Sequence, residues 1–571
     1  MNNDFEKYSQ QLSDALEGKL SNVNFDEYKG FSYFVKGDIS GIQDFIFNVK
    51  SRGAAKTLKG KSLYVQAASE LCLAFAEEHF GKNNLKHLYN GGGDFYFFLK
   101  NADESKMNSF KAKVLKEMLP KEIYIDLTFE PIKDSDLAQF GEKWAVINKA
   151  SVINQMKQYK DVKVSDLFEP FDFSRVKETL DWKEFTTRYN KKENVAISSK
   201  ITPKHEPQLF DLQYHFSGAW SDNNSKLPTW TTSLKQKYAE VIDEKEEDAN
   251  YNLDSDWQIP SPGNLVEFDY LARFAAARCG TSKLGVLKMD VDNLGDFFAK
   301  RQNINELKTC SKSLAWFFEE YLIKDLLKKE FEYLVLDLEK DNKPQKYKVL
   351  QNNKEQTYFK VKKEKTPYHE NIYVIFSGGD DCFLLGAWDA VFAFAKLVHN
   401  EFERFTKQNK SITLSASLVL VDAKFPVVQF AKLANDALSA AKNPKQGKHK
   451  ISLMGEVFSW QDFDKIEQIA LDLQRIIIEK REPRGILDKI RLSARGFLGI
   501  QNRLNIHQLN TPRIWRLLWY LRGSKNKAEM EVLFQKQYIK PLLVAYVSKQ
   551  NNNAMLFPIA ARWAEFLTRK K

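Results

Sequence analysis

The alternation of apolar and polar positions over residues 1–145 predicts strands and helices that follow one another. We expect strands at 31–36, in the segment HLYNGGGDFYFFL and at 123–129, with helices at 41–49, 63–80 and 105–119. A basic, glycine-containing stretch at 51–61 is expected to lie between the first two helices.

Residues 263–460 show the same kind of pattern. An apolar strand at 284–288 ends at Asp290, and a helix begins near Leu294. Strands at 373–376 and 382–385 flank the turn sequence SGGDD. Further expected elements are a helix at 388–405, a strand at 412–421, a helix at 427–441 and a short strand at 451–454. The order β-α-β-β-α-β is that of a ferredoxin-like or palm domain.

The other segments differ from these two regions. Residues 146–262 are weakly periodic and predict a linking domain that ends in an acidic, then Asn-, Ser- and Pro-rich boundary. Residues 461–571 predict a helical bundle with basic faces, with helices at 463–481, 483–502, 511–521 and 527–549. A Lys-, Asn- and Gln-rich stretch at 338–368 is expected to be a solvated loop inserted in the second palm.

An internal repeat links the two palm regions. GDISGIQDFIF at 37–47 aligns with MDVDNLGDFFA at 289–299, and GGGDFYFFL at 91–99 aligns with SGGDDCFLL at 377–385. Both matches fall at the same places in the same element order, which indicates a duplicated fold. The predicted fold class is therefore α+β, with palm domains at 1–145 and 263–460, a linking domain at 146–262 and a C-terminal α-helical bundle at 461–571.

The two copies differ in their acidic residues. The second copy carries Asp290, Asp292, Asp380 and Asp381. The first copy keeps Asp38 and Asp94 but has Ser40 and Phe95 at the other two positions. Only the second copy offers a dense acidic cluster, so we expect the first, degenerate copy to bind a nucleotide rather than metal ions.

The cluster of Asp290, Asp380 and Asp381 predicts a metal-dependent reaction. Three carboxylates this close repel one another unless a cation lies between them. Oxygen ligands suit Mg²⁺ or Mn²⁺, and two such ions can promote attack by a ribose hydroxyl and loss of pyrophosphate. Gly378 and Gly379 allow the backbone to approach a bound nucleotide closely.

Four further residues are candidates for substrate contact. Asp292 and Asn293 either contact a metal or the nucleotide, or they cap the helix that follows. The segment AKNPKQGKHK places Lys442 and Lys448 in a basic loop that suits a triphosphate, although a solvated charged loop has the same composition.

Bulk composition adds limits to this interpretation. The formal net charge of +11 fits a polyanion such as RNA, or simply a basic protein. The four cysteines form no CxxC motif, which suits a reducing cytoplasm and gives no zinc ribbon. We expect no signal peptide and no membrane span. The histidines occur singly and are expected to be structural; none is followed by Asp, and neither GxSxG nor a Walker motif occurs.

These residues resemble the large subunit of type III CRISPR effector complexes, the Cas-ten family, and its Csm branch in particular. The segments that carry the resemblance are GDISGIQDFIF, LKGKSLYVQAASE, YNGGGDFYFFL, LKMDVDNLGDFF, IFSGGDDCFLLGAWD and ANDALSAAKNPKQGKHKISLMG. The second palm is also similar to bacterial GGDEF cyclases, in which the lysine corresponding to Lys442 contacts phosphate.

The resemblance implies a function and partners. Such subunits bind guide CRISPR RNA together with other Csm-type subunits. On recognising target RNA they convert ATP into cyclic oligoadenylates, which activate accessory effectors. Two ATP molecules would lie between the palms, with Asp290, Asp380 and Asp381 as the catalytic, metal-binding acids and Ser40, Asp38 and Asp94 in the companion palm.

Two departures from the family pattern are expected. The family often begins with an HD nuclease domain, and no HD pair occurs here, so DNA cleavage by this chain is not expected. The family often has a zinc site between the palms, which the cysteine spacing does not support.

Three alternatives remain open. A non-catalytic scaffold would leave the acidic cluster without a use. Some relatives join AMP to S-adenosylmethionine with the same palm. A free-standing diguanylate cyclase would not need the duplicated palm or the helical end.

Overall fold

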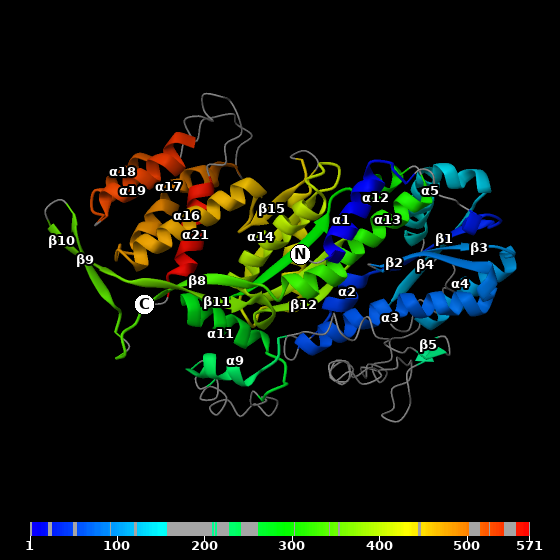
Figure 1. The fold of residues 1–571 in the computed structure, drawn as a ribbon, viewed down its shortest axis with the longest axis horizontal. Coiled ribbons are helices and arrows are strands. Elements are labelled where there is room, and N and C mark those ends of the chain that lie inside the picture. Colours follow the sequence, from blue (N-terminus) through cyan, green and yellow to red (C-terminus); the bar gives the residue numbers. More distant parts are fainter. Residues whose placement is uncertain are drawn as a thin grey trace.

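The computed structural model describes residues 3–20, 26–49, 54–91, 93–118, 123–156, 208–209, 212–213, 228–240, 242, 261–301, 303–341, 343–351, 354–443, 447–501, 514–524, 526–541 and 555–569. Most of the predicted linking domain lies outside these residues. In Figure 1 two sheets follow one another along the long axis, and the C-terminal helices lie at the end opposite the first sheet.

The first sheet is antiparallel, with the order β2-β3-β1-β4. Its strands are β1 (Tyr33–Ser40), β2 (Leu85–Gly91), β3 (Asp94–Leu99) and β4 (Tyr124–Pro131). The helices between them are α2 (Ile42–Phe47), α3 (Ala54–Phe80) and α4 (Glu104–Met118). These elements confirm the predicted succession of strands and helices.

Helix α3 begins earlier than predicted. The basic stretch 51–61 was expected to precede it, but the helix already starts at Ala54. Ala54 and Leu58 are buried and give this turn an apolar face. Lys61 is buried as well, because its Nζ donates to the carbonyl oxygens of Phe45 at 3.1 Å and Asn48 at 2.9 Å. Lysine counts as a polar residue in the sequence pattern even where it is buried, so the first turns of this helix were not predicted.

The second sheet has the order β12-β13-β7-β14-β15-β16. Its strands are β7 (Leu284–Val291), β12 (Ile372–Gly378), β13 (Asp381–Ala387), β14 (Leu414–Val421), β15 (Lys450–Leu453) and β16 (Glu456–Ser459). Its helices include α12 (Leu294–Ala299), α13 (Ile304–Ala315), α14 (Trp388–Phe405) and α15 (Val427–Ala441). Counted within each copy, both sheets place the fourth, first, third and second strands side by side. The α+β class with palm domains is confirmed.

The insertion in the second palm is not the loop we predicted. It forms two antiparallel strand pairs, β8 (Glu330–Leu336) with β11 (Val361–Pro367) and β9 (Lys346–Gln351) with β10 (Lys354–Phe359). Its outermost hairpin extends to the far left in Figure 1. Cross-strand ion pairs such as Lys363–Glu332 at 2.9 Å replace the apolar contacts that would have marked the strands in the sequence.

Packing does not follow the expected domain limit at residue 145. Helix α5 (Phe140–Gln155) runs through it and packs on β4 and β1. Helix α1 (Asn3–Leu16), which the sequence analysis did not identify, packs on α13 instead of the first sheet. Its Phe5 ring lies 4.8 Å from Tyr321 and 5.5 Å from Phe405 (centroid distances), both of the second palm. We therefore propose a limit for the first palm beyond residue 155.

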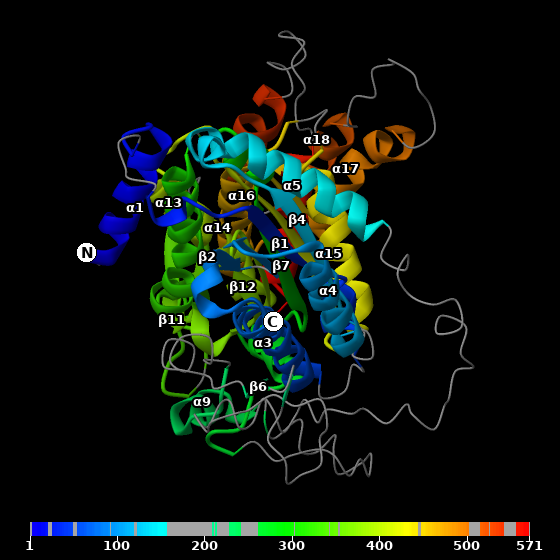
Figure 2. The ribbon, with the colours of Figure 1, turned by 90° about the vertical axis from the view of Figure 1, so that its right-hand side faces the viewer.

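The two palms share their hydrophobic cores. Both of the large clusters of buried side chains draw residues from both sheets. The ring centroids of Phe47 and Phe383 lie 4.6 Å apart, and the Tyr373 hydroxyl donates to the carbonyl oxygen of Ala55 at 2.9 Å. Figure 2, which looks along the long axis, shows β1 and β7 one behind the other. The relative position of the two palms is thus set by packing as well as by chain connection.

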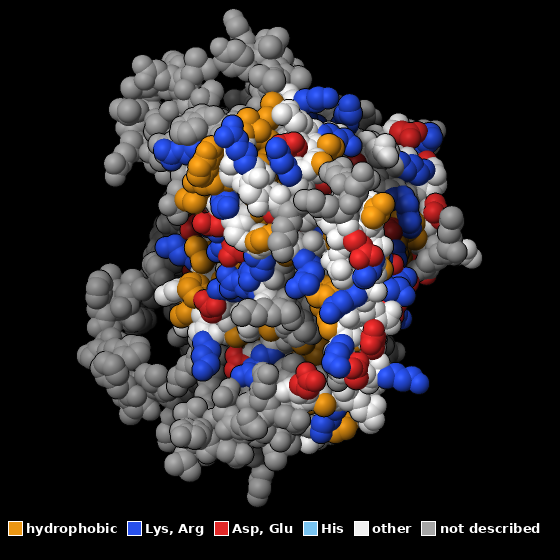
Figure 3. Space-filling view, turned by 90° about the vertical axis from the view of Figure 1, so that its left-hand side faces the viewer, with side chains coloured by type: hydrophobic (Ala, Val, Ile, Leu, Met, Phe, Trp, Pro, Cys, Tyr) orange, Lys and Arg blue, Asp and Glu red, His pale blue; other side chains and the backbone are white. Residues whose placement is uncertain are grey.

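The C-terminal region is helical, as predicted. The described helices are α16 (Trp460–Ile478), α17 (Gly485–Gln501), α18 (Ile514–Leu521), α19 (Lys527–Phe534) and α21 (Leu556–Leu567). Its exposed basic side chains include Arg481, Arg484, Arg516, Arg522, Lys527, Lys536 and Lys540. Figure 3, which views this end of the molecule, shows many Lys and Arg side chains with fewer Asp and Glu side chains among them. Among the described residues, no helix is long and apolar enough to span a membrane.

A buried ion pair joins three elements around the second palm. Arg278 of α11 (Phe268–Cys279) donates through Nε and Nη2 to Asp389 of α14, at 2.6 and 2.7 Å. Its Nη1 donates to the Tyr238 hydroxyl at 2.6 Å and to Asn371 Oδ1 at 2.9 Å. The Arg278 and Asp389 side chains are only 3% and 7% exposed.

We predict that Asp389→Ala lowers the free energy of unfolding by about 3–5 kcal/mol, because it leaves a buried guanidinium without its carboxylate. Urea unfolding followed by circular dichroism measures the change. Asp422→Ala is the control, since Asp422 is 71% exposed and its ion pair with Lys283 is worth at most about 1 kcal/mol. Equal midpoints for the two variants would contradict the prediction.

Candidate active site between the two palm domains

The register of the second sheet brings the predicted acidic cluster together. Asp381, the first residue of β13, pairs directly with Asp290 of β7. Residues opposite each other on antiparallel strands have Cβ atoms about 4.5–5.5 Å apart. Asp380 lies in the preceding two-residue turn, and its carbonyl oxygen accepts a hydrogen bond from the Val291 N–H at 3.0 Å. The predicted proximity of the three carboxylates is confirmed.

The turn itself depends on glycine. Gly379 has φ +63°, the left-handed conformation that a tight hairpin needs at its first turn position. Its N–H donates to Glu319 Oε1 at 3.2 Å. A Cβ atom at Gly378 would lie 3.2 Å from the same oxygen. Glu319 belongs to the π-helical segment η6 (Trp316–Leu326). Its carboxylate therefore supports the SGGDD turn through the hydrogen bond from the Gly379 N–H.

Lys442 supplies a positive charge to the cluster. Its Nζ contacts Asp290 Oδ1 and lies 3.2 Å from the carbonyl oxygen of Val291. Lys442 is the C-cap residue of α15, so the helix end fixes where its side chain starts. Its placement beside the acidic cluster agrees with the prediction of a lysine at the site, and its contact with phosphate stays a prediction.

The first palm repeats this geometry with a different charge balance. Asp94 pairs directly with Asp38 across β3 and β1, as Asp381 does with Asp290. The predicted alignment of the two turns was therefore wrong by one residue: Asp94 is the structural equivalent of Asp381, and Gly93 is that of Asp380. Here, however, the neutralising cation comes from the same strand. Lys36 Nζ lies 2.8 Å from Asp38 Oδ2 and 3.4 Å from Asp94 Oδ2, and its side chain is 6% exposed. The first copy thus contains a built-in positive charge between its two opposed aspartates.

Among the described residues, Lys288, the equivalent of Lys36 in the second palm, forms no ion pair with the acids, although its charge lowers the pKa of Asp381. Its Nζ donates to Asn435 Oδ1 at 2.7 Å. Asn435 in turn donates to Gln43 Oε1 of the first palm. Burial lowers the pKa of Lys288. The same lysine position thus neutralises the acids in one copy and joins the two palms in the other.

A cavity of about 230 Å³ lies between the two palms. Side chains of α2 and α3, among them Gln43, Lys59 and Glu70, line one side, together with Asn90 and Gly93 of the β2–β3 turn. Glu319, Phe376, Ser377, Gly378 and Asp381 line the other side. The segment LKGKSLYVQAASE, identified from the sequence, therefore faces the acidic turn of the other palm.

Burial and mutual repulsion shift the carboxyl groups of the site. Burial, followed by the charge of Asp290, raises the pKa of Asp381 to about 7. The pKa of Asp380 is raised well above its ordinary value by burial and by its two acidic neighbours. Burial and the charge of Asp38 raise the pKa of Asp94 to about 7. The negative charge of Asp380 also raises the pKa of Asp94, so the acidic residues of the two palms interact electrostatically.

Asp292 has a structural environment. It is 1% exposed, and its oxygens accept hydrogen bonds from Thr413 Oγ1 at 2.8 Å, Ser415 Oγ at 2.8 Å and the His449 N–H at 3.0 Å. These bonds favour a structural role, and contact of Asp292 with metal or nucleotide stays a prediction without geometric support.

Asn293 lies at the N-cap position of α12 with φ 57°, but its side chain makes no capping bond. Its Oδ1 instead accepts from Lys448 Nζ. The alternative of side-chain capping is wrong for Asn293. Asp292 and Asn293 thus both form hydrogen bonds with the segment 448–449, next to the acidic cluster.

Ser40 occupies the position of Asp292 in the first palm. Its buried Oγ has no hydrogen-bond partner among the described residues, and neither has Asn90 Oδ1 on the neighbouring turn. Buried polar atoms without partners are costly unless a ligand or water satisfies them. The first palm therefore offers free hydrogen-bonding capacity close to the cavity.

The carboxylate set fits hard divalent cations. Asp290, Asp380 and Asp381 supply oxygen ligands only, and the raised pKa values of Asp380 and Asp381 indicate that the site favours added positive charge. This donor set suits Mg²⁺ or Mn²⁺ better than a thiolate-binding metal.

Two family models match the chain, one on each palm. Domain B of the Csm1 subunit matches residues 31–173, and the second palm domain of Cas10/Cmr2 matches residues 283–452. The protein of Methanocaldococcus jannaschii named "CRISPR system single-strand-specific deoxyribonuclease Cas10/Csm1 (subtype III-A)" is 28% identical over 505 residues, which cover 76% of this chain and 59% of that protein. The chain belongs to the Cas10/Csm1 family.

The likeness to other Cas10/Csm1 proteins extends over most of the chain. The Streptococcus thermophilus protein of the same name is 23% identical over 561 residues, 90% of this chain and 65% of that protein. This Cas10/Csm1 chain thus spans less than two thirds of the length of these relatives.

Solved structures share the fold. A Csm1-Csm4 cassette in complex with pppApA aligns with a TM-score of 0.62 and 16% identity, over 97% of this chain and 71% of that one. A cassette in complex with cA4 aligns with a TM-score of 0.61 over 97% and 72%.

Three residues of the site were missed in the sequence. Lys59 is 2% exposed and lines the cavity, and burial lowers its pKa to about 8. Glu319 supports the turn from a segment 60 residues away, and burial raises its pKa to about 7. Of these three residues, only Lys36 could have been found from the sequence. A lysine precedes the first Asp by two positions in both copies of the repeat, in KGD and KMD.

We predict that Asp381→Asn stabilises the metal-free Cas10/Csm1 chain at pH 8 and has little effect at pH 4. The folded state holds a proton on Asp381 up to a pKa of about 7, against an ordinary value of 3.8. Stability is therefore lost as pH rises between these values, and the variant avoids this loss. Melting temperatures in a chelating buffer measure the effect, with exposed Asp422→Asn as control. An equal shift at both pH values would contradict the assignment.

Proposed function

We propose that this Csm-type large subunit polymerises and cyclises ATP into cyclic oligoadenylates when its complex binds target RNA. One observation carries the proposal. Two palms with the same cross-strand pair of aspartates face one cavity, and among the described residues only the first pair forms ion pairs with a lysine of its own strand. One copy is thus arranged to bind cations and the other to bind a nucleotide that needs no metal site of its own.

The acidic cluster would hold the ions in this reaction. Asp290, Asp380 and Asp381 are the proposed ligands, since the strand register fixes two of them opposite each other. When bound, two Mg²⁺ or Mn²⁺ ions would activate the attacking ribose hydroxyl and stabilise the leaving pyrophosphate. The bond formed joins that hydroxyl oxygen to the α-phosphorus of a second ATP, and the bond broken releases pyrophosphate.

The basic loop would hold the triphosphate. Lys442 Nζ already lies at Asp290, and Lys448 Nζ contacts Asn293 at the start of α12. Gly378 and Gly379 keep the turn free of side chains on the cavity side. Phosphoryl transfer needs mainly positioning and charge neutralisation, which these groups provide.

The first palm would bind the second nucleotide. Ser40 and Asn90 offer unsatisfied buried oxygens for its hydroxyl or amino groups. Lys36 forms ion pairs with both Asp38 and Asp94 and offsets one of their two negative charges, and the two aspartates can accept hydrogen bonds from a ribose without a metal ion. Lys59 adds a buried cation to the same cavity.

Partners follow from the relatives. Solved relatives are named as Csm1-Csm4 cassettes, in complexes with ATP, cA3 or cA4. We propose that this chain likewise assembles with Csm subunits, and with guide CRISPR RNA and target RNA. The exposed basic residues of the C-terminal helices suit contact with a polyanion.

The test is an assembled complex with guide RNA, labelled ATP, and Mg²⁺ or Mn²⁺, run with and without matching target RNA. We expect cyclic oligoadenylates only with target, and their loss in Asp380→Ala/Asp381→Ala. Asp341→Ala/Asp422→Ala is the matched control, because both residues are exposed carboxylates in surface ion pairs.

The other outcomes separate the alternatives. A product that appears only when S-adenosylmethionine is added would keep the palm chemistry and change the acceptor to that molecule. No product under any condition, with guide and target still bound, would leave a scaffold subunit and refute the enzyme.

We predict that Lys442→Gln lowers kcat/KM for ATP in this complex by about 10- to 100-fold, as loss of a charged hydrogen bond worth about 1.5–3 kcal/mol implies. Lys450→Gln, at the start of β15 in the same segment, should stay within about twofold. Equal losses in the two variants would show that Lys442 has no specific role with ATP.

A further inference from the structure

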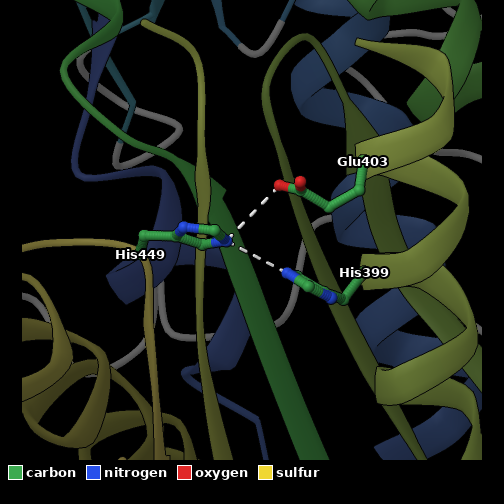
Figure 4. Close-up of side chains that lie close together, drawn as sticks. All are labelled: His399, Glu403 and His449. Atoms are coloured by element: carbon green, nitrogen blue, oxygen red, sulfur yellow. Dashed lines mark hydrogen bonds and ion pairs between the residues drawn. The ribbon is translucent and has the colours of Figure 1, made fainter. Parts of the chain in front are cut away.

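Two histidines and a glutamate meet at the edge of the second palm, outside the cavity. His399 and Glu403 lie one turn apart on α14, and His449 lies just before β15. Figure 4 shows the three side chains pointing toward one another. The sequence analysis treated these histidines singly and expected them to be structural, because 50 positions separate them in the chain.

The spacing of the three polar atoms fits a metal ion. His399 Nε2 lies 3.1 Å from His449 Nε2, and His449 Nε2 lies 3.4 Å from Glu403 Oε1. The three ligand atoms all lie within 4.8 Å of one another. Ligands about 2.0–2.1 Å from a tetrahedral zinc ion lie about 3.3 Å from each other, close to the two measured distances.

The surrounding residues hold the two rings in place. His399 is 9% exposed and stacks on Trp460, with ring centroids 3.9 Å apart and an interplanar angle of 17°. His449 is positioned through its backbone, whose N–H donates to Asp292 Oδ2 at 3.0 Å and to Ser415 Oγ at 3.1 Å.

We propose that His399, Glu403 and His449 bind a divalent transition-metal ion of the zinc class and so anchor the basic loop of the second palm to helix α14. The His449 side chain is 38% exposed, which leaves room for water as a fourth ligand. Two imidazoles and one carboxylate distinguish this site from the all-oxygen cluster of Asp290, Asp380 and Asp381.

The site has a direct connection to the acidic cluster. His449 is adjacent to Lys448, which contacts Asn293, and its N–H holds Asp292, two residues after Asp290. An ion that fixes His449 therefore fixes the loop end that carries Lys448. The consequence for ATP rests on the proposed function, whereas binding of the ion does not.

Zinc binding by the purified full chain tests the site itself. The chain is incubated with Zn²⁺, dialysed, and analysed for bound zinc by mass spectrometry, together with a zinc titration of the melting temperature. We expect one tightly held equivalent and a rise in melting temperature. His449→Asn and Glu403→Gln should each weaken binding by more than about 100-fold, beyond the effect of losing an outer partner.

The variants are chosen so that folding is preserved. Asn tolerates the left-handed backbone of His449, where φ is +63°, and Glu403 is 26% exposed. His87→Gln is the matched control, because His87 also pairs with a glutamate, Glu77 at 2.7 Å, and the described residues supply no third ligand at that pair. Asp380→Ala/Asp381→Ala should keep its zinc.

The outcomes are distinct. Zinc retention equal in wild-type protein, His449→Asn and His87→Gln would overturn the site, as would loss of the zinc only in the Asp380→Ala/Asp381→Ala variant. In the assembled complex, removal of zinc by a chelator should raise KM for ATP in wild-type protein and leave His449→Asn unchanged. An inactive complex that still binds zinc at the three residues would refute the proposed function and keep the metal site.

Discussion

The structure depends on how the charge of opposed carboxylates is balanced. An antiparallel register places an aspartate directly across from another aspartate in each palm, Asp38 with Asp94 and Asp290 with Asp381. Such a pair is unfavourable unless positive charge is added. Lys36 adds it from within the strand in the first palm, whereas in the second palm Lys442 reaches in from the end of a helix. This difference is the basis for the proposal that the first copy binds a nucleotide and the second copy binds cations.

Because the two palms pack against each other, their two acidic sites lie beside one shared cavity. Buried clusters include residues of both sheets, and polar contacts such as Tyr373 with Ala55 cross between them. The cavity is consequently lined by both copies, and the charge of Asp380 is felt at Asp94. The proposed reaction between two nucleotides would need such a shared, pre-formed space.

Support for the acidic turn comes from outside the repeat. Glu319, in a π-helical segment, accepts from the Gly379 N–H, and His449 holds Asp292 through its backbone. π-helical turns are often found at functional sites. Both residues lie outside the repeated motifs, so the geometry of the cluster is maintained by segments that are not part of the repeat.

The sequence by itself determined the duplication, the palm order and the Asp290, Asp380 and Asp381 cluster, because strand periodicity and a repeated motif are local properties of the chain. It did not determine the strands at 338–368, the start of α3 or the role of α1, because polar cross-strand pairs and buried lysines do not follow an apolar pattern. Only the tertiary structure decided where Lys36 and Glu319 point, which side chains engage Asp292, and that His399 meets His449. Those contacts join residues far apart in the chain, and only the packing of the elements brings them within hydrogen-bonding distance.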